Sequence, residues 1–98
     1  MIIDWEELFK QDNTVFHCEI EDIAIEFLSI AHNLDYEWRN GDSYLHKNEW
    51  SFYKEETCYN IKNGTFADVE YFINEMGYKI INISELLYGR KPFKLKRK

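Results

Sequence analysis

The sequence contains none of the short motifs that usually identify an enzyme or a cofactor-binding protein. Its four glycines are spread over 98 residues, and no two lie close enough together to form a phosphate-binding loop. The two cysteines form no C-x-x-C pair and the three histidines form no H-x3-5-H pair, which are spacings typical of zinc ligands. We therefore expect no catalytic residue, no metal site and no cofactor, and we predict that the protein is not an enzyme.

The sequence also lacks a long hydrophobic run. No segment approaches the roughly 20 apolar residues that cross a bilayer, and the N-terminus has no basic-plus-apolar segment of the kind that directs secretion. We therefore expect a cytoplasmic protein with no membrane segment. In that compartment Cys18 and Cys58 would be reduced thiols, and we expect both to behave as small buried hydrophobic residues.

Acidic and basic residues are unevenly distributed. All 18 acidic residues but only 6 of the 12 basic ones lie in residues 1–89, which carry a formal charge of −12. Such a body repels the phosphate backbone of nucleic acid and attracts a basic groove on another protein. Residues 90–98 are instead strongly basic and are predicted to be a flexible tail. If nucleic acid binds at all, we expect contact through Arg90, Lys91, Lys94, Lys96, Arg97 and Lys98.

Hydrophobic periodicity predicts a small single α+β domain in residues 1–89. The strongest signal is a helix over residues 19–34, whose apolar side chains recur at i, i+3, i+4 and i+7 and form one stripe. Asp4 and Thr65 begin capping-box patterns, which predict further helices over 4–10 and 65–76, and Ser84 is expected to cap a last turn. Strands are expected over residues 14–17, 36–39, 57–61 and 78–83.

The expected order of elements, α-β-α-β-β-α-β, predicts a mostly antiparallel sheet with both long helices packed on one face. A ferredoxin-like arrangement would satisfy this order. Residues 42–54 follow no clean helical or strand period, and we expect a loop there with a short strand inside it. The pattern does not determine the strand order or the oligomeric state.

Several residues together form a recognisable pattern. It consists of His17-Cys18, Trp38, Trp50-x-x-Tyr53, Thr57-Cys58-Tyr59 and Gly77-Tyr78-Lys79-Ile80-Ile81. In this pattern, which covers nearly the whole chain before the tail, the sequence resembles small uncharacterised proteins encoded by phages and prophages of low-GC Gram-positive bacteria. The resemblance implies a phage-related setting and, since that family has no assigned activity, no catalytic residue.

Aromatic residues supply the first candidate binding residues. We expect Trp38, Trp50, Tyr53 and Tyr59 to be available for binding, because Trp and Tyr are over-represented at protein interfaces and can also stack on a base. Trp50 and Tyr53 lie in the least periodic stretch and are the least explained by packing. The alternative is that these aromatic side chains fill the core of a small domain.

Three acidic residues, Glu49, Glu55 and Glu56, complete the candidate site. With the acidic body, they favour a non-enzymatic, phage-type accessory protein that binds a host protein. Such a protein would inhibit a host defence or nucleic-acid-processing complex by presenting an acidic, DNA-mimicking surface. The plainer alternative is that these carboxylates only keep the protein soluble. A different function would be small-ligand or nucleotide binding, in which the four aromatic residues line a pocket and Arg39 or Lys54 contacts a phosphate.

Overall fold

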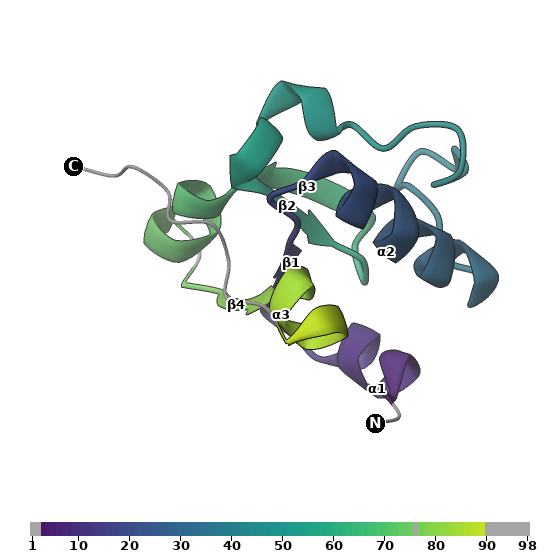
Figure 1. The fold of residues 1–98 in the computed structure, drawn as a ribbon, viewed down its shortest axis with the longest axis horizontal. Helices are drawn as coiled ribbons and strands as arrows, with labels where there is room; N and C mark the ends of the chain where they lie inside the picture. The colour runs from purple at the N-terminus through teal and green to yellow at the C-terminus, as the bar shows by residue number, and fades with distance from the viewer. Residues whose placement is uncertain (1–2, 76, 90–98) are drawn as a thin grey trace.

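Four short strands form one mixed β-sheet through the middle of the molecule (Figure 1). They are β1 (Thr14–His17), β2 (Thr57–Asn60), β3 (Thr65–Asp68) and β4 (Lys79–Asn82), and their order in the sheet is β3-β2-β1-β4. β2 pairs antiparallel with both β1 and β3, whereas β1 and β4 are parallel. β3 and β4 are therefore the two edges of this sheet.

The computed structural model describes residues 3–75 and 77–89. The α-helices in this part of the chain are α1 (Trp5–Lys10), α2 (Glu21–Asn33) and α3 (Ile83–Tyr88). Together with the sheet, they confirm the predicted α+β class. None of the helices in the described ranges has the length and apolar character needed to span a bilayer. The predicted flexible tail, residues 90–98, lies outside the described residues.

Two helices begin where a side chain replaces a missing backbone hydrogen-bond partner. The Asp4 carboxylate accepts a hydrogen bond of 3.1 Å from the backbone N–H of Glu7, so the predicted cap of α1 is confirmed. At α3 the cap is Asn82, whose side-chain oxygen accepts a 2.9 Å bond from the backbone N–H of Glu85. The prediction that Ser84 caps this helix is wrong, because Ser84 already lies inside α3.

One face of the sheet carries the main hydrophobic core. Phe16 of β1 and Tyr59 of β2 lie opposite each other in register and are both buried. The apolar stripe predicted for the long helix covers them, and its buried members in α2 are Ala24, Phe27, Leu28 and Ala31. Phe9 of α1 and Ile83 of α3 belong to the same cluster. All three α-helices therefore pack on this face.

A short helical turn covers the opposite face. Residues 69–75, which end in the π-helical segment η3 (Tyr71–Glu75), place Val69 and Phe72 against Val15 and Cys58. The sequence instead predicted that this helix shares a face with the long helix. The difference arises because the first four residues of the predicted segment extend the sheet, and the chain then turns to the other side.

Residues 65–68 form β3 and do not open a helix. The Thr65-x-x-Asp68 pattern imitates a capping box, but here Thr65 lies opposite Asn60 and Asp68 lies opposite Thr57 in an antiparallel pair. The cap itself comes later in the chain, because the Asp68 carboxylate accepts a 2.9 Å hydrogen bond from the backbone N–H of Tyr71. A partner strand outside the local sequence therefore decides the conformation of these four residues.

Residues 36–39 form no strand, although aromatic and charged side chains alternate there. The backbone N–H of Trp38 donates to the Asp42 carbonyl at 3.0 Å, so this segment closes a turn and does not join the sheet. Tyr36 still faces the core, with its ring 5.3 Å from that of Phe9. The alternation indicates which side chains point inward, but it supplies no partner for the backbone.

The order of elements is nonetheless close to the prediction, since β1, α2, β2, β3, η3 and β4 follow one another along the chain. The two consecutive strands are, however, 57–60 and 65–68, where the sequence predicted 36–39 and 57–61. The arrangement also differs from the ferredoxin-like one that would satisfy the predicted order, because α2 and η3 lie on opposite faces of the sheet.

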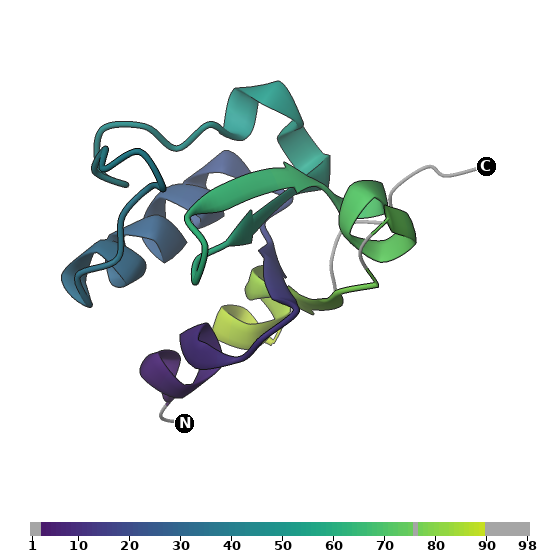
Figure 2. The ribbon, with the colours of Figure 1, turned by 180° about the vertical axis from the view of Figure 1, so that it is seen from behind.

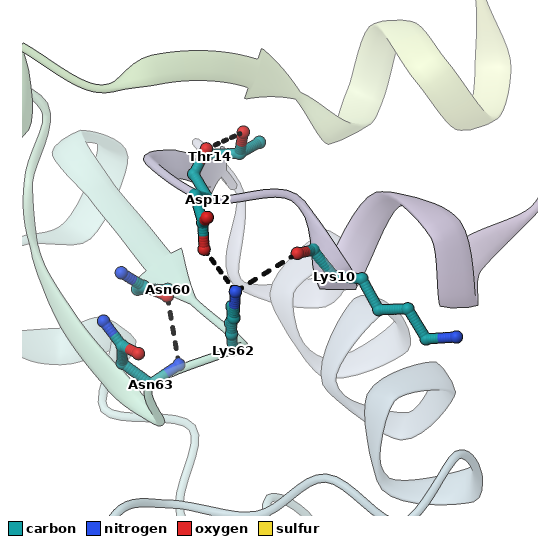
Figure 3. Close-up of polar contacts among 6 residues, drawn as sticks. All are labelled: Lys10, Asp12, Thr14, Asn60, Lys62 and Asn63. Atoms are coloured by element: carbon teal, nitrogen blue, oxygen red, sulfur yellow. Dashed lines mark hydrogen bonds and ion pairs between the residues drawn. The ribbon is translucent and has the colours of Figure 1, made fainter.

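The turn between β2 and β3 is fixed to the beginning of the chain (Figure 3). Lys62 places its ammonium group on the Asp12 carboxylate and 3.3 Å from the Lys10 carbonyl. Within the turn, the side-chain oxygen of Asn60 accepts a 3.1 Å hydrogen bond from the backbone N–H of Asn63. The ion pair is exposed and contributes little energy. Together these contacts position the β2–β3 turn, from which the edge strand β3 begins.

Candidate functional site

Two of the predicted binding residues, Trp38 and Tyr59, lie in the core. Trp38 is 6% exposed, and its indole N–H donates a 2.7 Å hydrogen bond to the Lys47 carbonyl. The Tyr59 hydroxyl donates a 2.6 Å bond to the Asn48 carbonyl. Burial, with a smaller effect of nearby acidic groups, raises the pKa of Tyr59, so its hydroxyl remains a neutral donor. Both rings therefore serve packing, and they hold the loop before β2 in place.

Trp50 is half-buried and anchors the same loop. Its indole N–H donates a 2.9 Å hydrogen bond to the Cys18 carbonyl, and its backbone N–H donates to the Asn48 side chain at 2.9 Å. Residues 42–54, all of which are described, were predicted to contain a short strand. They contain a 3-10 turn, η1 (Trp50–Phe52), and the start of a second, η2 (Lys54–Glu56), and no strand.

Tyr53 belongs to a group of exposed aromatic residues around β3. Phe52 is 69% exposed, Tyr71 45% and Tyr53 40%. The rings of Phe52 and Tyr53 each lie 5.8 Å from the ring of Phe66, which is part of β3. Three rings from two segments of the chain therefore meet at the edge of the sheet. We call Arg39, Phe52, Tyr53, Phe66 and Tyr71 the edge surface.

The arrangement of the elements around β3 explains why these residues gather. In Figure 2 the green β3 crosses the view, with η1 and η2 above it and the helical turn of residues 69–75 at one end. The β2–β3 hairpin lies at the other end. Because β3 has a neighbouring strand on one side only, the side chains that surround its other side are accessible.

Two hollows adjoin β3. The Trp38 hollow has a volume of about 320 Å³ and is lined by residues that include Trp38, Asp42, Lys47, Glu49 and Phe66. The Tyr78 hollow has a volume of about 560 Å³ and is lined by residues that include Tyr53, Ala67, Tyr71, Phe72 and Tyr78. Arg39, Thr65 and Phe66 line both. The two hollows therefore meet along the edge strand.

Arg39 is held beside both hollows by a close approach to Gly64. The Arg39 backbone N–H donates a 3.0 Å hydrogen bond to the Gly64 carbonyl. A Cβ at Gly64 would lie 2.5 Å from the Arg39 nitrogen and 2.8 Å from the Glu37 carbonyl oxygen, and the φ of +70° also favours glycine. The Arg39 side chain is exposed, and its guanidinium makes no hydrogen bond or ion pair with residues 3–75 or 77–89.

Other charges in the Trp38 hollow compensate one another. The Lys47 ammonium lies 3.0 Å from the Asp42 carboxylate, and this contact lowers the pKa of Asp42 and raises the pKa of Lys47. Arg39 and Glu49 are the remaining charged residues that line this hollow. Lys54, the second cation predicted to meet a phosphate, lines neither hollow. Arg39 is therefore the cation that this surface offers to a partner.

The three predicted acidic residues are not brought together at one point. Glu49 lines the Trp38 hollow and has a left-handed backbone, with φ of +56°. Glu55 is exposed in η2, where its carbonyl accepts a 2.7 Å hydrogen bond from His17. Glu56 is half-buried at the end of the same turn. Only Glu49 borders the edge surface directly.

A second group of polar residues is buried at the ends of β1 and β4. The Glu19 carboxylate accepts a 2.7 Å hydrogen bond from the Ser84 hydroxyl and a 3.1 Å bond from the Asn82 amide. Glu19 is 4% exposed and Ser84 5%, so a substrate in solution cannot reach them. The group joins the chain after β1 to the beginning of α3, and we assign it a structural role.

Replacing Glu19 with glutamine is expected to flatten the acid dependence of stability. Burial would raise the pKa of Glu19, but the bonds from Ser84 and Asn82 and the nearby His17 outweigh it and lower that pKa. A lowered folded-state pKa stabilises the protein above the unfolded value of about 4.3, and this contribution disappears as pH falls through the folded pKa. The variant should also lose about 1–3 kcal/mol at pH 7, because one of the two accepting oxygens becomes an NH2 group that faces a donor.

Urea unfolding of wild type and Glu19→Gln between pH 7 and pH 2.5 measures both effects. Glu6→Gln is the matched control, since Glu6 is exposed on α1 and its removal should change the free energy of unfolding by less than about 0.5 kcal/mol. Equal pH dependence in wild type and Glu19→Gln would show that the buried carboxylate contributes nothing to acid sensitivity.

The cysteines and histidines form no alternative site in the described residues. Cys18 and Cys58 are buried and neither forms a disulfide. Burial, followed by the nearby Cys58 and Glu19, raises the pKa of the Cys18 thiol, which makes it a poor nucleophile. Among residues 3–75 and 77–89, no three His, Cys, Asp or Glu side chains are grouped as metal ligands would be.

Comparison with known proteins yields no relative: no family model, no curated protein and no solved structure matches this chain. The candidate site therefore rests on the geometry alone. Sequence reasoning missed Phe66 and Tyr71, because it placed both in a helix whose apolar residues would be buried. The available signal was Lys62-Asn63-Gly64, which is typical of a hairpin turn and predicts that Thr65-Phe66 begins a second strand.

Proposed function

We propose that the protein is a non-enzymatic binding protein that holds another protein at the edge surface. The observation that carries this proposal is the exposure of Phe52, Tyr53 and Tyr71 around a sheet edge, beside the half-buried Phe66. Rigid aromatic side chains that remain exposed in a small domain are the anchors that protein interfaces use most. These rings are exposed to water in the free protein, and their burial on binding is favourable because it removes apolar surface from water.

The proposed partner is a host protein, and the protein would act as a phage-type accessory factor that inhibits a host defence or nucleic-acid-processing complex. The likeness to phage and prophage proteins of low-GC Gram-positive bacteria supports this setting. The formal charge of −12 on residues 1–89 supports a basic partner, because opposite charge accelerates encounter between proteins. In this proposal the charge speeds association, and the aromatic residues determine how long the complex lasts.

Replacing Phe52 and Tyr53 together with alanine is expected to weaken partner binding at least 30-fold, about 2 kcal/mol. The reason is that both rings are exposed and would be buried only in the complex. The tagged protein is used to capture partners from a nuclease-treated lysate of a low-GC Gram-positive bacterium, and the affinity of the captured protein is then measured by titration.

The matched control removes two exposed apolar side chains elsewhere, Ile25 and Leu45, which are 48% and 58% exposed. Ile25→Ala with Leu45→Ala should leave affinity within about twofold of wild type. Binding that weakens equally in both double variants would place the contact elsewhere, and capture of no protein by wild type would contradict the proposal.

A second candidate function, nucleotide binding, is favoured by one observation. The Arg39 guanidinium, which has no partner among residues 3–75 and 77–89, and the half-buried Phe66 line the same hollow, which is the pairing needed for a phosphate and a base. Because Trp38 lines that hollow, its fluorescence should change as nucleotide is added. A titration to millimolar concentration without any change would count decisively against this function.

A further inference from the structure

The outer side of β3 is an unpaired sheet edge in the described part of the chain. β3 pairs with β2 through four consecutive residue pairs without a bulge, and no strand in the described residues pairs with its other side. Natural proteins usually protect such an edge with proline, with lysine, with a bulge or with a covering segment. The sequence Thr65-Phe66-Ala67-Asp68 has neither proline nor lysine, and the Asp68 carboxylate is engaged with the backbone of Tyr71.

The two hollows meet at this edge, and their linings extend to opposite faces of the sheet. Trp38 and Phe66 pack with the main core, whereas Ala67, Phe72 and Tyr78 belong to the cluster on the other face. Successive side chains of an added strand point alternately to the two faces of a sheet. One set would therefore enter the Trp38 hollow and the other set the Tyr78 hollow.

Charge indicates which segment would fit. Arg39 lies beside both hollows, and its guanidinium has no partner among residues 3–75 and 77–89, so an acidic side chain on the added strand would complete an ion pair. A second copy of this chain is disfavoured as the occupant, because two chains with a formal net charge of −6 each repel one another.

We infer that β3 accepts an extended segment of the partner protein as a fifth strand, with apolar side chains in the two hollows and one acidic side chain on Arg39. This inference rests on the proposed function and specifies how the edge surface binds. In this mode the backbone hydrogen bonds supply affinity, and the pockets for alternate side chains supply specificity. The described length of β3, four residues, matches a paired segment of roughly four residues.

The inference is tested with a display library of random ten-residue peptides selected on the full chain. Enriched peptides should alternate apolar and polar residues and carry Asp or Glu at one fixed position. N-methylation of successive backbone amides in the best peptide should weaken binding about tenfold or more at every second amide only, because alternate N–H groups of an edge strand face its partner. Enrichment of peptides with a helical period, or insensitivity to N-methylation, would overturn the inference.

Arg39→Glu provides the second measurement. This substitution should lower the affinity for the acidic peptide at least tenfold. A peptide with lysine at the fixed position should then bind the variant. Lys10→Glu is the matched control, because Lys10 is exposed on α1 and lines neither hollow. Absence of this reciprocal effect, or a dimer in sedimentation that the peptide cannot dissociate, would also overturn the inference.

The outcome distinguishes this inference from the proposed function. In one outcome, capture of a host protein depends on Phe52 and Tyr53, but no peptide of alternating pattern is enriched. That outcome would support the proposed function and contradict the inference of an added strand. If neither a protein nor a peptide binds, both fail.

Discussion

Gly64→Ala is expected to destabilise the protein by about 2–5 kcal/mol. A non-glycine residue at φ of +70° costs about 1–2 kcal/mol. The new Cβ would also lie 2.5 Å from the Arg39 nitrogen and 2.8 Å from the Glu37 carbonyl oxygen, and backbone atoms at that distance must move, at a further cost of about 1–3 kcal/mol. Urea unfolding at pH 7 gives the free energies.

Gly89→Ala is the matched control. Gly89 follows α3 with φ of +69°, nearly the same as Gly64, but a Cβ there would have no atom of the described residues within 4 Å. Its substitution should cost only the same conformational term of about 1–2 kcal/mol. The difference between the two variants therefore measures the close approach of the hairpin to residues 37–39. Equal costs would mean that this loop yields easily and that Arg39 is not held beside β3.

The substitution should affect binding as well as stability. The Arg39 backbone is bonded to the Gly64 carbonyl at 3.0 Å, so a Cβ that displaces residues 37–39 also displaces the guanidinium from the hollows. A folded fraction of Gly64→Ala should therefore bind the acidic peptide more weakly than folded Gly89→Ala. The same glycine thus links the packing of the hairpin to the proposed recognition of a partner.

Local patterns in the sequence were sufficient for the helices of the main core. The α2 stripe needs no information beyond its own spacing. Four of its predicted apolar residues are buried, and the other three, Ile20, Ile23 and Leu34, are half-buried. The Asp4 cap of α1 is likewise local, since its hydrogen bond spans three residues. Such interactions lie within one or two turns of a helix, so sequence alone can predict them.

The two errors in strand assignment have a common physical origin. Whether residues 36–39 or 65–68 join the sheet depends on which distant segment offers backbone partners, and Thr57 to Asn60 pair with the later segment. Alternating side chains and a capping-box pattern are compatible with several backbone pairings. A strand is therefore determined by its neighbour, which a single sequence does not identify.

The candidate site was harder to predict than the fold because aromatic residues serve both packing and binding. Trp38, Trp50 and Tyr59 each donate a hydrogen bond to a backbone carbonyl far along the chain, and these bonds commit them to the interior. Tyr53 remains exposed beside Phe52. No feature of spacing separates the two groups, since the distinction depends on the three-dimensional path of the loop.

Phe27→Ala is expected to be among the most destabilising single substitutions, with a loss of about 3–5 kcal/mol in the free energy of unfolding. Phe27 is fully buried in α2, and its ring lies 5.2 Å from Phe16, 5.7 Å from Phe9 and 5.8 Å from Trp5. Alanine would leave a cavity between the helix and the sheet, bounded by rigid rings that cannot collapse into it.

Phe52→Ala removes the same side chain from a surface position and should change stability by less than about 0.5 kcal/mol. Phe52 is 69% exposed, so its removal opens no cavity, although it should weaken binding of the partner. Urea unfolding at pH 7 compares the two variants with wild type. A large loss of stability in Phe52→Ala would show that this ring supports the fold, and the edge surface would then lose its most exposed anchor. A small loss in Phe27→Ala would mean that the core reorganises, since this buried ring otherwise joins α2 to α1 and to the sheet.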